Sequence, residues 1–145
     1  MRRPAVVVDA SVAVKWILPE QDHEQALMVQ EQYQNEQLDI LAPYLLVSEV
    51  ANVLWKRQSR GDIGPDTARR CFQQFLDDCP TLLDVAAVSA AALALAMAHR
   101  RPVYDYLYLA LALEQRCDVI TADERFFNAV NMAFPCVRLL RSCTL

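Results

Sequence analysis

The chain has 145 residues and a formal net charge of −4, and 54% of its residues are hydrophobic against 22% that are charged. This length and composition predict one globular domain with a buried core, and they exclude a disordered or low-complexity chain. The negative net charge also excludes a general attraction to nucleic acid, so any contact with RNA or DNA requires a local basic patch or a bound cation.

The first part of the chain alternates short apolar runs with longer segments of helical pattern. Residues 5–9 contain three consecutive valines and predict a buried strand. Ser11 is a candidate cap for a short helix that runs toward Trp16 and is interrupted by Pro19. The elements predicted next are a helix over residues 22–35, a strand over 38–42, and a helix over 44–60 that Gly61 ends.

The second part continues the same alternation, and prolines mark its boundaries. Pro65 suits the first turn of a helix over residues 65–78, and Pro80 and Pro102 each stop a predicted element. The remaining predicted elements are a strand over 81–85, helices over 86–99 and 104–116, a strand over 118–121, a helix over 123–130 and a last strand over 137–140.

Strands that alternate with helical crossovers indicate an α/β fold. We expect a three-layer α/β/α sandwich whose central, mainly parallel sheet has four to five strands. No repeat, low-complexity segment or linker divides the sequence, so residues 1–145 are interpreted as a single domain.

The five cysteines are scattered and odd in number, and none forms a CxxC pair. This arrangement argues against a disulfide scaffold and favours reduced thiols in a cytoplasmic protein. No uncharged apolar run approaches the roughly 20 residues that cross a bilayer. The apolar run after Met1 is too short for the core of a signal peptide, so no membrane contact is expected.

Four acidic residues lie among apolar neighbours, where soluble proteins rarely place a charge: Asp9, Glu49, Asp105 and Asp123. Ligands of parallel α/β sheets bind beyond the carboxyl ends of the strands, and two of these acids directly follow a predicted strand. Each acid alone has a simpler explanation, since Asp105 suits a first helical turn and Asp123 could cap the helix after it. Together they predict one acidic cleft.

A cleft of this kind requires either protons or a metal cation to neutralise its charge. Two carboxylates about 5 Å apart repel by roughly 3 kcal/mol at an effective dielectric constant near 20, and four of them make several such pairs. Ligands that are all oxygen favour Mg²⁺ or Mn²⁺, and these ions can activate a water molecule and stabilise charge on a phosphodiester.

The segments around the four acids are distinctive: residues 7–16 (VVDASVAVKW), 43–52 (PYLLVSEVAN), 103–112 (VYDYLYLALA) and 120–123 (ITAD). In this order, and over almost the full length, they resemble the PIN-domain nucleases, and specifically the VapC-like toxins of type II toxin–antitoxin pairs. One departure is Pro102, which stands where that family commonly has a serine or threonine as a helix cap.

The resemblance implies a Mg²⁺- or Mn²⁺-dependent endoribonuclease that a small antitoxin inhibits and that forms a homodimer. Asp9, Asp105 and Asp123 would be the main metal ligands. Glu49 would complete this catalytic, metal-binding set, directly or through water, and would help to activate the attacking water. Ser11 and Thr121 match polar positions beside the site that orient the carboxylates. Asn52 is a further candidate for that role, although an amide on the helix surface is an equally common use of such a residue.

RNA requires cationic contacts with its phosphates, and the candidates are Lys15, Lys56, Arg57, Arg100 and Arg101. Each of them except Lys15 is more simply interpreted as a solvated surface charge or, for Arg100 and Arg101, as a charge at the C-terminus of a helix. Trp16 and Trp55 could stack on bases, but packing in the core or a dimer interface is the commoner use of tryptophan. The helices that begin near Asp22 and Tyr44 are the expected walls of an antitoxin groove, on resemblance alone.

Two other interpretations remain open. A receiver-like module also gathers acids around Mg²⁺ at strand ends, but it would require a lysine late in the chain, and no lysine follows Lys56. The alternative is a catalytically silent PIN-like module that only binds a partner, and sequence alone does not exclude it.

Overall fold

The computed structural model describes residues 2–143, and its centre is a sheet of five parallel strands. The valine run forms the middle strand β1 (Ala5–Val8), which pairs with β2 (Asp39–Pro43) on one side and β4 (Asp118–Thr121) on the other. β3 (Thr81–Leu83) and β5 (Val137–Leu139) are the edge strands, and the order across the sheet is β3-β2-β1-β4-β5. The predicted parallel sheet is confirmed.

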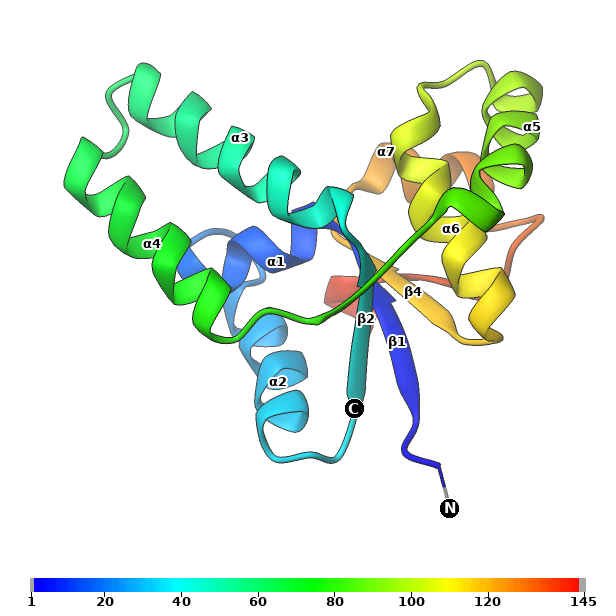
Figure 1. Ribbon diagram of the computed structural model, residues 1–145, viewed down its shortest axis with the longest axis horizontal. Helices are drawn as coiled ribbons and strands as arrows, with labels where there is room; N and C mark the ends of the chain where they lie inside the picture. The colour runs from blue at the N-terminus through cyan, green and yellow to red at the C-terminus, as the bar shows by residue number, and fades with distance from the viewer. Residues whose placement is uncertain (1, 144–145) are drawn as a thin grey trace.

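Helices cover both faces of the sheet, as the predicted three-layer sandwich requires. Figure 1 shows α1 to α4 on one side of the strands and α5 and α6 on the other. The helices are α1 (Ala10–Ile17), α2 (His23–Gln34), α3 (Leu45–Ser59), α4 (Pro65–Asp77), α5 (Ser89–His99), α6 (Val103–Gln115) and α7 (Glu124–Val130). Within the described residues, no helix is both long and apolar enough to cross a membrane.

The predicted helix over 86–99 begins differently in the structure. Residues Ala86–Val88 form a 3₁₀ turn, and α5 starts only at Ser89. The Asp84 carboxylate accepts a hydrogen bond from the Ala86 amide at 2.9 Å, and the Ser89 hydroxyl donates to the Val85 carbonyl at 2.8 Å. These local bonds favour a tight turn before the helix. The prediction that Gly61 ends α3 is confirmed, since Gly61 has a φ of 81°.

The prediction that Ser11 caps the first helix is wrong. Asp9 is the N-cap of α1, and its side chain accepts a hydrogen bond from the Val12 amide. An aspartate in extended conformation directly before a helix reaches the amides of the first turn, whereas Ser11 already lies inside that turn. The first acid therefore follows β1 and opens α1 at the same position.

The strand order separates this fold from the receiver-like alternative. Receiver modules have the order 2-1-3-4-5, whereas here β1 lies between β2 and β4. β1 and β4 are adjacent and parallel, so their carboxyl ends, which precede Asp9 and Asp123, lie at the same edge of the sheet.

Candidate functional site: an acidic pocket at the strand ends

Asp9 is the most buried of the four acids, with 7% of its surface exposed. Three donors hold its carboxylate: the Ser11 hydroxyl at 2.5 Å, the Thr121 hydroxyl at 2.5 Å and the Val12 amide at 3.3 Å. The two hydroxyls contact different carboxylate oxygens, so the orientation of the carboxylate is fixed. The structure thus brings Ser11 and Thr121 against Asp9.

The same two hydroxyls connect the end of β1 to the turn after β4. The Ser11 oxygen accepts a hydrogen bond from the Ala122 amide at 2.8 Å, and the Thr121 oxygen accepts one from the Asp123 amide at 3.1 Å. Each hydroxyl therefore donates to Asp9 and accepts from the segment that positions Asp123. This network sets the relative positions of the first and fourth acids.

The other three acids come from three different helical segments. Glu49 lies on α3, where the Tyr108 hydroxyl donates to its Oε1 at 2.6 Å. Asp105 lies in the first turn of α6, a helix that has no side-chain cap at Pro102. Asp123 is the N-cap of α7, and its Oδ1 accepts from the Arg125 and Phe126 amides at 2.9 and 3.2 Å.

All four carboxylates line one pocket of about 210 Å³. Its other lining residues are Ala10, Ser11, Val14, Val53 and Tyr108. The pocket lies beyond the carboxyl ends of the central strands, where ligands of parallel sheets bind.

The donor set of this pocket fits a hard divalent cation, because every charged group in it is a carboxylate. Among residues 2–143, no three acidic, histidine or cysteine side chains are already gathered closely enough to enclose a metal ion. Mg²⁺ usually binds through one or two carboxylates and keeps several water ligands, so a wider acidic pocket suits it better than a closed protein cage.

The electrostatics of the pocket also favour the binding of a positive charge. The pKa of Asp9 is raised to about 6, mainly by burial and to a smaller extent by the charge of Asp105, although the hydrogen bonds from Ser11 and Thr121 lower it. Burial also raises the pKa values of Glu49 and Asp105, and the charges of Asp105 and Asp123 respectively add to these shifts. A cation in the pocket would offset the free-energy cost of holding these carboxylates in their charged forms.

Metal-free protein should consequently lose stability as the pH rises from about 4 to about 7. The pKa of Asp9 is about 6 in the fold against 3.8 in the unfolded chain, so between these values the folded state holds a proton that the unfolded state releases. The shift corresponds to about 3 kcal/mol in the free energy of unfolding.

Urea unfolding in chelator across this pH range measures the effect, and the difference between wild type and Asp9→Asn isolates it. We expect the free energy of unfolding of the wild type to fall by about 3 kcal/mol relative to that of Asp9→Asn as the pH rises to 7. A difference independent of pH would contradict the assigned electrostatics.

The structure does not bring Asn52 to the acids. Asn52 is exposed on α3 and does not line the pocket, and no hydrogen bond among the described residues joins it to any of the four carboxylates. The spacing of three residues from Glu49 places both on neighbouring positions of the helix, but only Glu49 turns toward the pocket. The orienting role predicted for Asn52 is therefore unsupported by the geometry.

Three of the five predicted RNA-binding residues are partly buried, and two are exposed. Lys15 and Arg57 both form ion pairs with Glu20, Lys15 at 3.3 Å, and burial lowers the pKa of Lys15. Arg101 is partly buried, and its charge lowers the pKa of Asp105. Lys56 and Arg100 are exposed.

Two residues that contact the predicted site residues were missed by the sequence analysis. Tyr108 lies three positions after Asp105 on α6, a helical spacing that could have indicated a shared face. Glu20 follows Pro19, and nothing in the sequence indicated that it would lie between Lys15 and Arg57.

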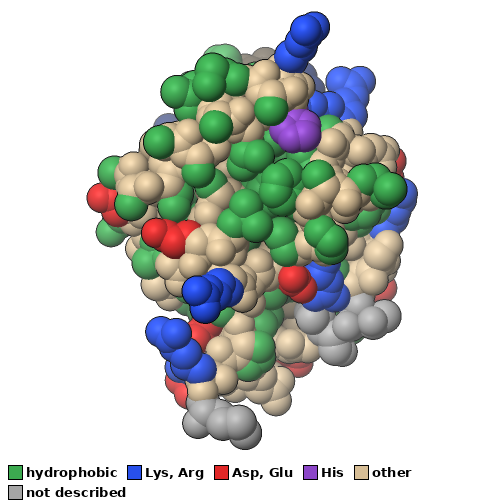
Figure 2. All heavy atoms as spheres, turned by 90° about the vertical axis from the view of Figure 1, so that its right-hand side faces the viewer, with side chains coloured by type: hydrophobic (Ala, Val, Ile, Leu, Met, Phe, Trp, Pro, Cys, Tyr) green, Lys and Arg blue, Asp and Glu red, His purple; other side chains and the backbone are tan. Residues whose placement is uncertain are grey.

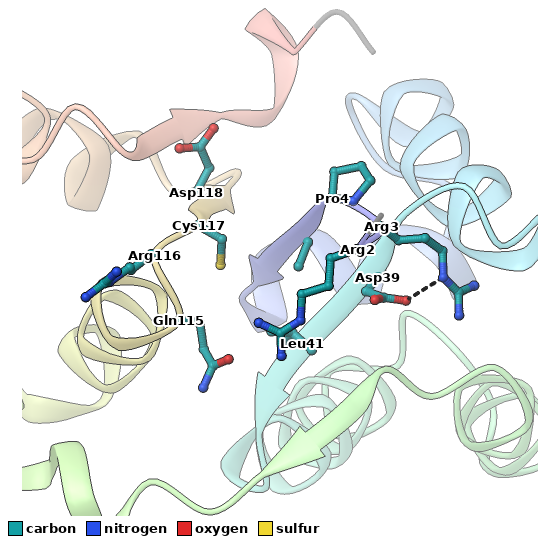
Figure 3. Close-up of a pocket in the computed structure, with 10 residues that line it drawn as sticks. Arg2, Arg3, Pro4, Asp39, Leu41, Gln115, Arg116, Cys117 and Asp118 are labelled. Carbon is teal, nitrogen blue, oxygen red and sulfur yellow. Dashed lines mark ion pairs between the residues drawn. The ribbon is translucent and has the colours of Figure 1, made fainter.

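A larger cavity of about 540 Å³ lies at the other end of the strands. Figure 3 shows Arg2 pointing into it, and Arg3 is drawn toward Asp39, with which it pairs at 3.6 Å. Cys117 and Asp118 complete its wall at the start of β4, and Asp118 is itself paired with Arg138 at 3.5 Å. The acids there are matched by arginines, so this cavity lacks the uncompensated charge of the acidic pocket.

Comparison with known proteins agrees with the geometry. A family model described as PIN domain matches residues 6–131. Ribonuclease VapC3 of Pyrobaculum aerophilum is 35% identical over 122 residues, which cover 83% of this chain and 90% of that protein.

Two solved structures have a similar fold. The crystal structure of PAE2754 from Pyrobaculum aerophilum aligns with a TM-score of 0.71 at 20% identity, covering 97% of this chain and 94% of that one. A toxin–antitoxin complex from Klebsiella pneumoniae aligns with a TM-score of 0.61 at 16% identity, covering 93% of this chain and 97% of its counterpart.

Proposed function

The chain belongs to the PIN-domain family, and from this membership we propose that it is a divalent-metal-dependent endoribonuclease and the toxin of a toxin–antitoxin pair. The observation that carries the proposal is the single pocket lined by Asp9, Glu49, Asp105 and Asp123. A protein that only binds a partner has no need to retain four mutually repelling carboxylates in one pocket.

Asp9, Asp105 and Asp123 would hold the cation, which we assign as Mg²⁺ or Mn²⁺. Such an ion lowers the pKa of a bound water and stabilises charge that develops on a phosphodiester. Ser11 and Thr121 keep the Asp9 carboxylate in one orientation. The Oδ2 of Asp123 is left for a ligand, because its Oδ1 accepts the amides of α7.

Glu49 would orient the attacking water and accept its proton. Its Oε1 is occupied by the Tyr108 hydroxyl, so Oε2 is the oxygen available for this role. The half-buried position of Glu49 favours proton acceptance, because burial raises its pKa toward neutrality.

The RNA backbone would contact the basic residues around the pocket. Arg101 is the favoured contact, because its charge lowers the pKa of Asp105, which lines the pocket, whereas Glu20 partly neutralises Lys15 and Arg57. Lys56 and Arg100 would add longer-range attraction from the surface.

The antitoxin is assigned to a groove between α3 and α4, and not to the expected walls α2 and α3. This groove has a volume of about 410 Å³, and Trp55, Leu54 and Phe72 line it. Trp55 is 60% exposed, which is unusual for a tryptophan outside an interface. Trp16, in contrast, is buried in the core.

A second copy of the chain is assigned to the face formed by α5 and α6. Hydrophobic side chains gather at the centre of this face in Figure 2. Leu93 and Met97 on α5 and Leu113 on α6 are exposed, and α5 carries no acidic, lysine or arginine residue between Ser89 and His99. An apolar face with one uncharged helix suits self-association by two-fold symmetry. All five cysteines are free, which favours the reducing cytoplasm as the place of action.

A cleavage assay on a structured RNA tests the proposed function. We expect purified protein to cut the RNA with Mg²⁺ or Mn²⁺, to stop when a chelator is added in excess, and to leave single-stranded DNA of the same sequence intact. Cleavage that survives chelation would contradict the metal-dependent mechanism. No cleavage under any metal condition, together with retained antitoxin binding, would favour the silent partner-binding alternative.

A further inference from the structure

Tyr108 connects two of the elements that form the acidic pocket. Its side chain is 1% exposed and lines the pocket, and its hydroxyl donates to the Glu49 Oε1 at 2.6 Å. Within residues 2–143, this is the one side-chain hydrogen bond that joins α3 to α6. Asp105, three positions earlier on α6, lines the same pocket, so one helix contributes both a carboxylate and a hydroxyl.

The bond constrains a side chain that is otherwise free to change its rotamer. A glutamate has three rotatable side-chain bonds, and among the described residues Tyr108 is the one hydrogen-bond partner of the Glu49 carboxylate. A hydroxyl that donates to a carboxylate at this distance forms a strong, charge-assisted bond. The tyrosine ring is itself held by burial, so it provides a fixed point against which the carboxylate is oriented.

We propose that Tyr108 is the positioning residue of Glu49: it holds one carboxylate oxygen of Glu49 in place, so that the other faces the cation and the attacking water. The inference rests on the proposed nuclease function and adds a residue to its site. Tyr108 acts through Glu49 and contributes no proton to the reaction. Asp9 has two hydroxyls for the equivalent purpose, whereas Glu49 has only this one.

Tyr106 provides a matched control two residues earlier on the same helix. Tyr106 is fully buried, and its hydroxyl has no hydrogen-bond partner in the described part of the chain. Its ring stacks on that of His99 with 5.5 Å between the ring centroids, and it meets the Phe126 ring edge-on with 5.7 Å between the centroids. Its role in the structure is therefore packing. Removing the Tyr106 hydroxyl should therefore change neither activity nor metal binding.

The experiment compares Tyr108→Phe with Tyr106→Phe. Phenylalanine fills the same space in both cases, and we expect both variants to fold, as shown by circular dichroism and urea unfolding. In Tyr108→Phe, kcat should fall by about 10- to 100-fold with little change in the KM for RNA, the range typical when a residue that orients a metal-site group is lost. Mn²⁺ binding measured by calorimetry should weaken in Tyr108→Phe and stay at the wild-type value in Tyr106→Phe.

A double variant tests whether Tyr108 acts through Glu49. If it does, Tyr108→Phe should cause no further loss in a Glu49→Gln background. Multiplying losses would overturn the proposal, as would a Tyr108→Phe variant that matches Tyr106→Phe in both kcat and Mn²⁺ affinity. If the wild-type protein cleaves no RNA, the proposed function fails, and the comparison of Mn²⁺ affinities still decides the role of Tyr108.

Discussion

Asp9→Asn should abolish metal-dependent RNA cleavage and leave the fold intact. Loss of a residue that only orients a metal ligand typically costs 10- to 100-fold, so loss of a direct ligand should cost about 1000-fold or more, or at least about 4 kcal/mol of transition-state stabilisation. Asparagine has nearly the same shape as aspartate, so the backbone around this position needs little rearrangement. Initial rates of cleavage at saturating Mg²⁺ measure the loss.

The same substitution should make the metal-free protein more stable at pH 7. The charge of Asp9 is buried, and its removal relieves about 3 kcal/mol at neutral pH. Part of this gain is offset, because Ser11 and Thr121 each donate to a different oxygen of the carboxylate, and the amide nitrogen of asparagine cannot accept a bond. We expect a net gain of about 1 to 2 kcal/mol in urea unfolding with chelator present.

Asp118→Asn is the matched control for this experiment. Asp118 lies at the opposite end of β4 from the pocket and pairs with Arg138 near the surface. The variant should keep its activity and gain no stability in the absence of metal. An Asp9→Asn protein that cleaves RNA at the wild-type rate would refute the assignment of Asp9, and one that unfolds more easily would refute the electrostatic account.

The order and type of the elements could be predicted because the local signals were strong. The valine run of β1, the prolines at helix boundaries and Gly61 after α3 each fix a local conformation, and tertiary contacts did not override them. The two errors were also local: Asp9 caps α1 in place of Ser11, and residues Ala86–Val88 form a 3₁₀ turn. Both involve alternative hydrogen bonds within one helical turn, which sequence patterns seldom distinguish.

The convergence of the four acids followed from strand ends and from the motifs, but their partners did not. Glu49 meets Tyr108 because the tyrosine side chain of α6 reaches α3 at the pocket, and residues on different helices carry no signal of this contact. Lys15 illustrates the opposite case. Its position after Asp9 suggested a free phosphate-binding cation, whereas the turn at Pro19 brings Glu20 back against it. Long-range pairing of charged side chains depends on backbone geometry that periodicity does not encode.

Asp123 serves two purposes, and a pair of substitutions should separate them. As the N-cap of α7 it accepts two backbone amides through Oδ1, and as a member of the acidic pocket it contributes negative charge. Asp123→Asn keeps an oxygen that can accept the same amides but removes the charge. Asp123→Ala removes both.

Both variants should therefore lose at least about 100-fold in cleavage rate, whereas only Asp123→Ala should lose about 1 kcal/mol of stability, the usual cost of a deleted cap. Initial cleavage rates and urea unfolding in chelator provide the two readouts. Equal stabilities for the two variants would mean that the amides of α7 do not depend on this side chain. An Asp123→Asn protein with full activity would show that the charge at this position is dispensable, and that Asp9 and Asp105 hold the cation without it.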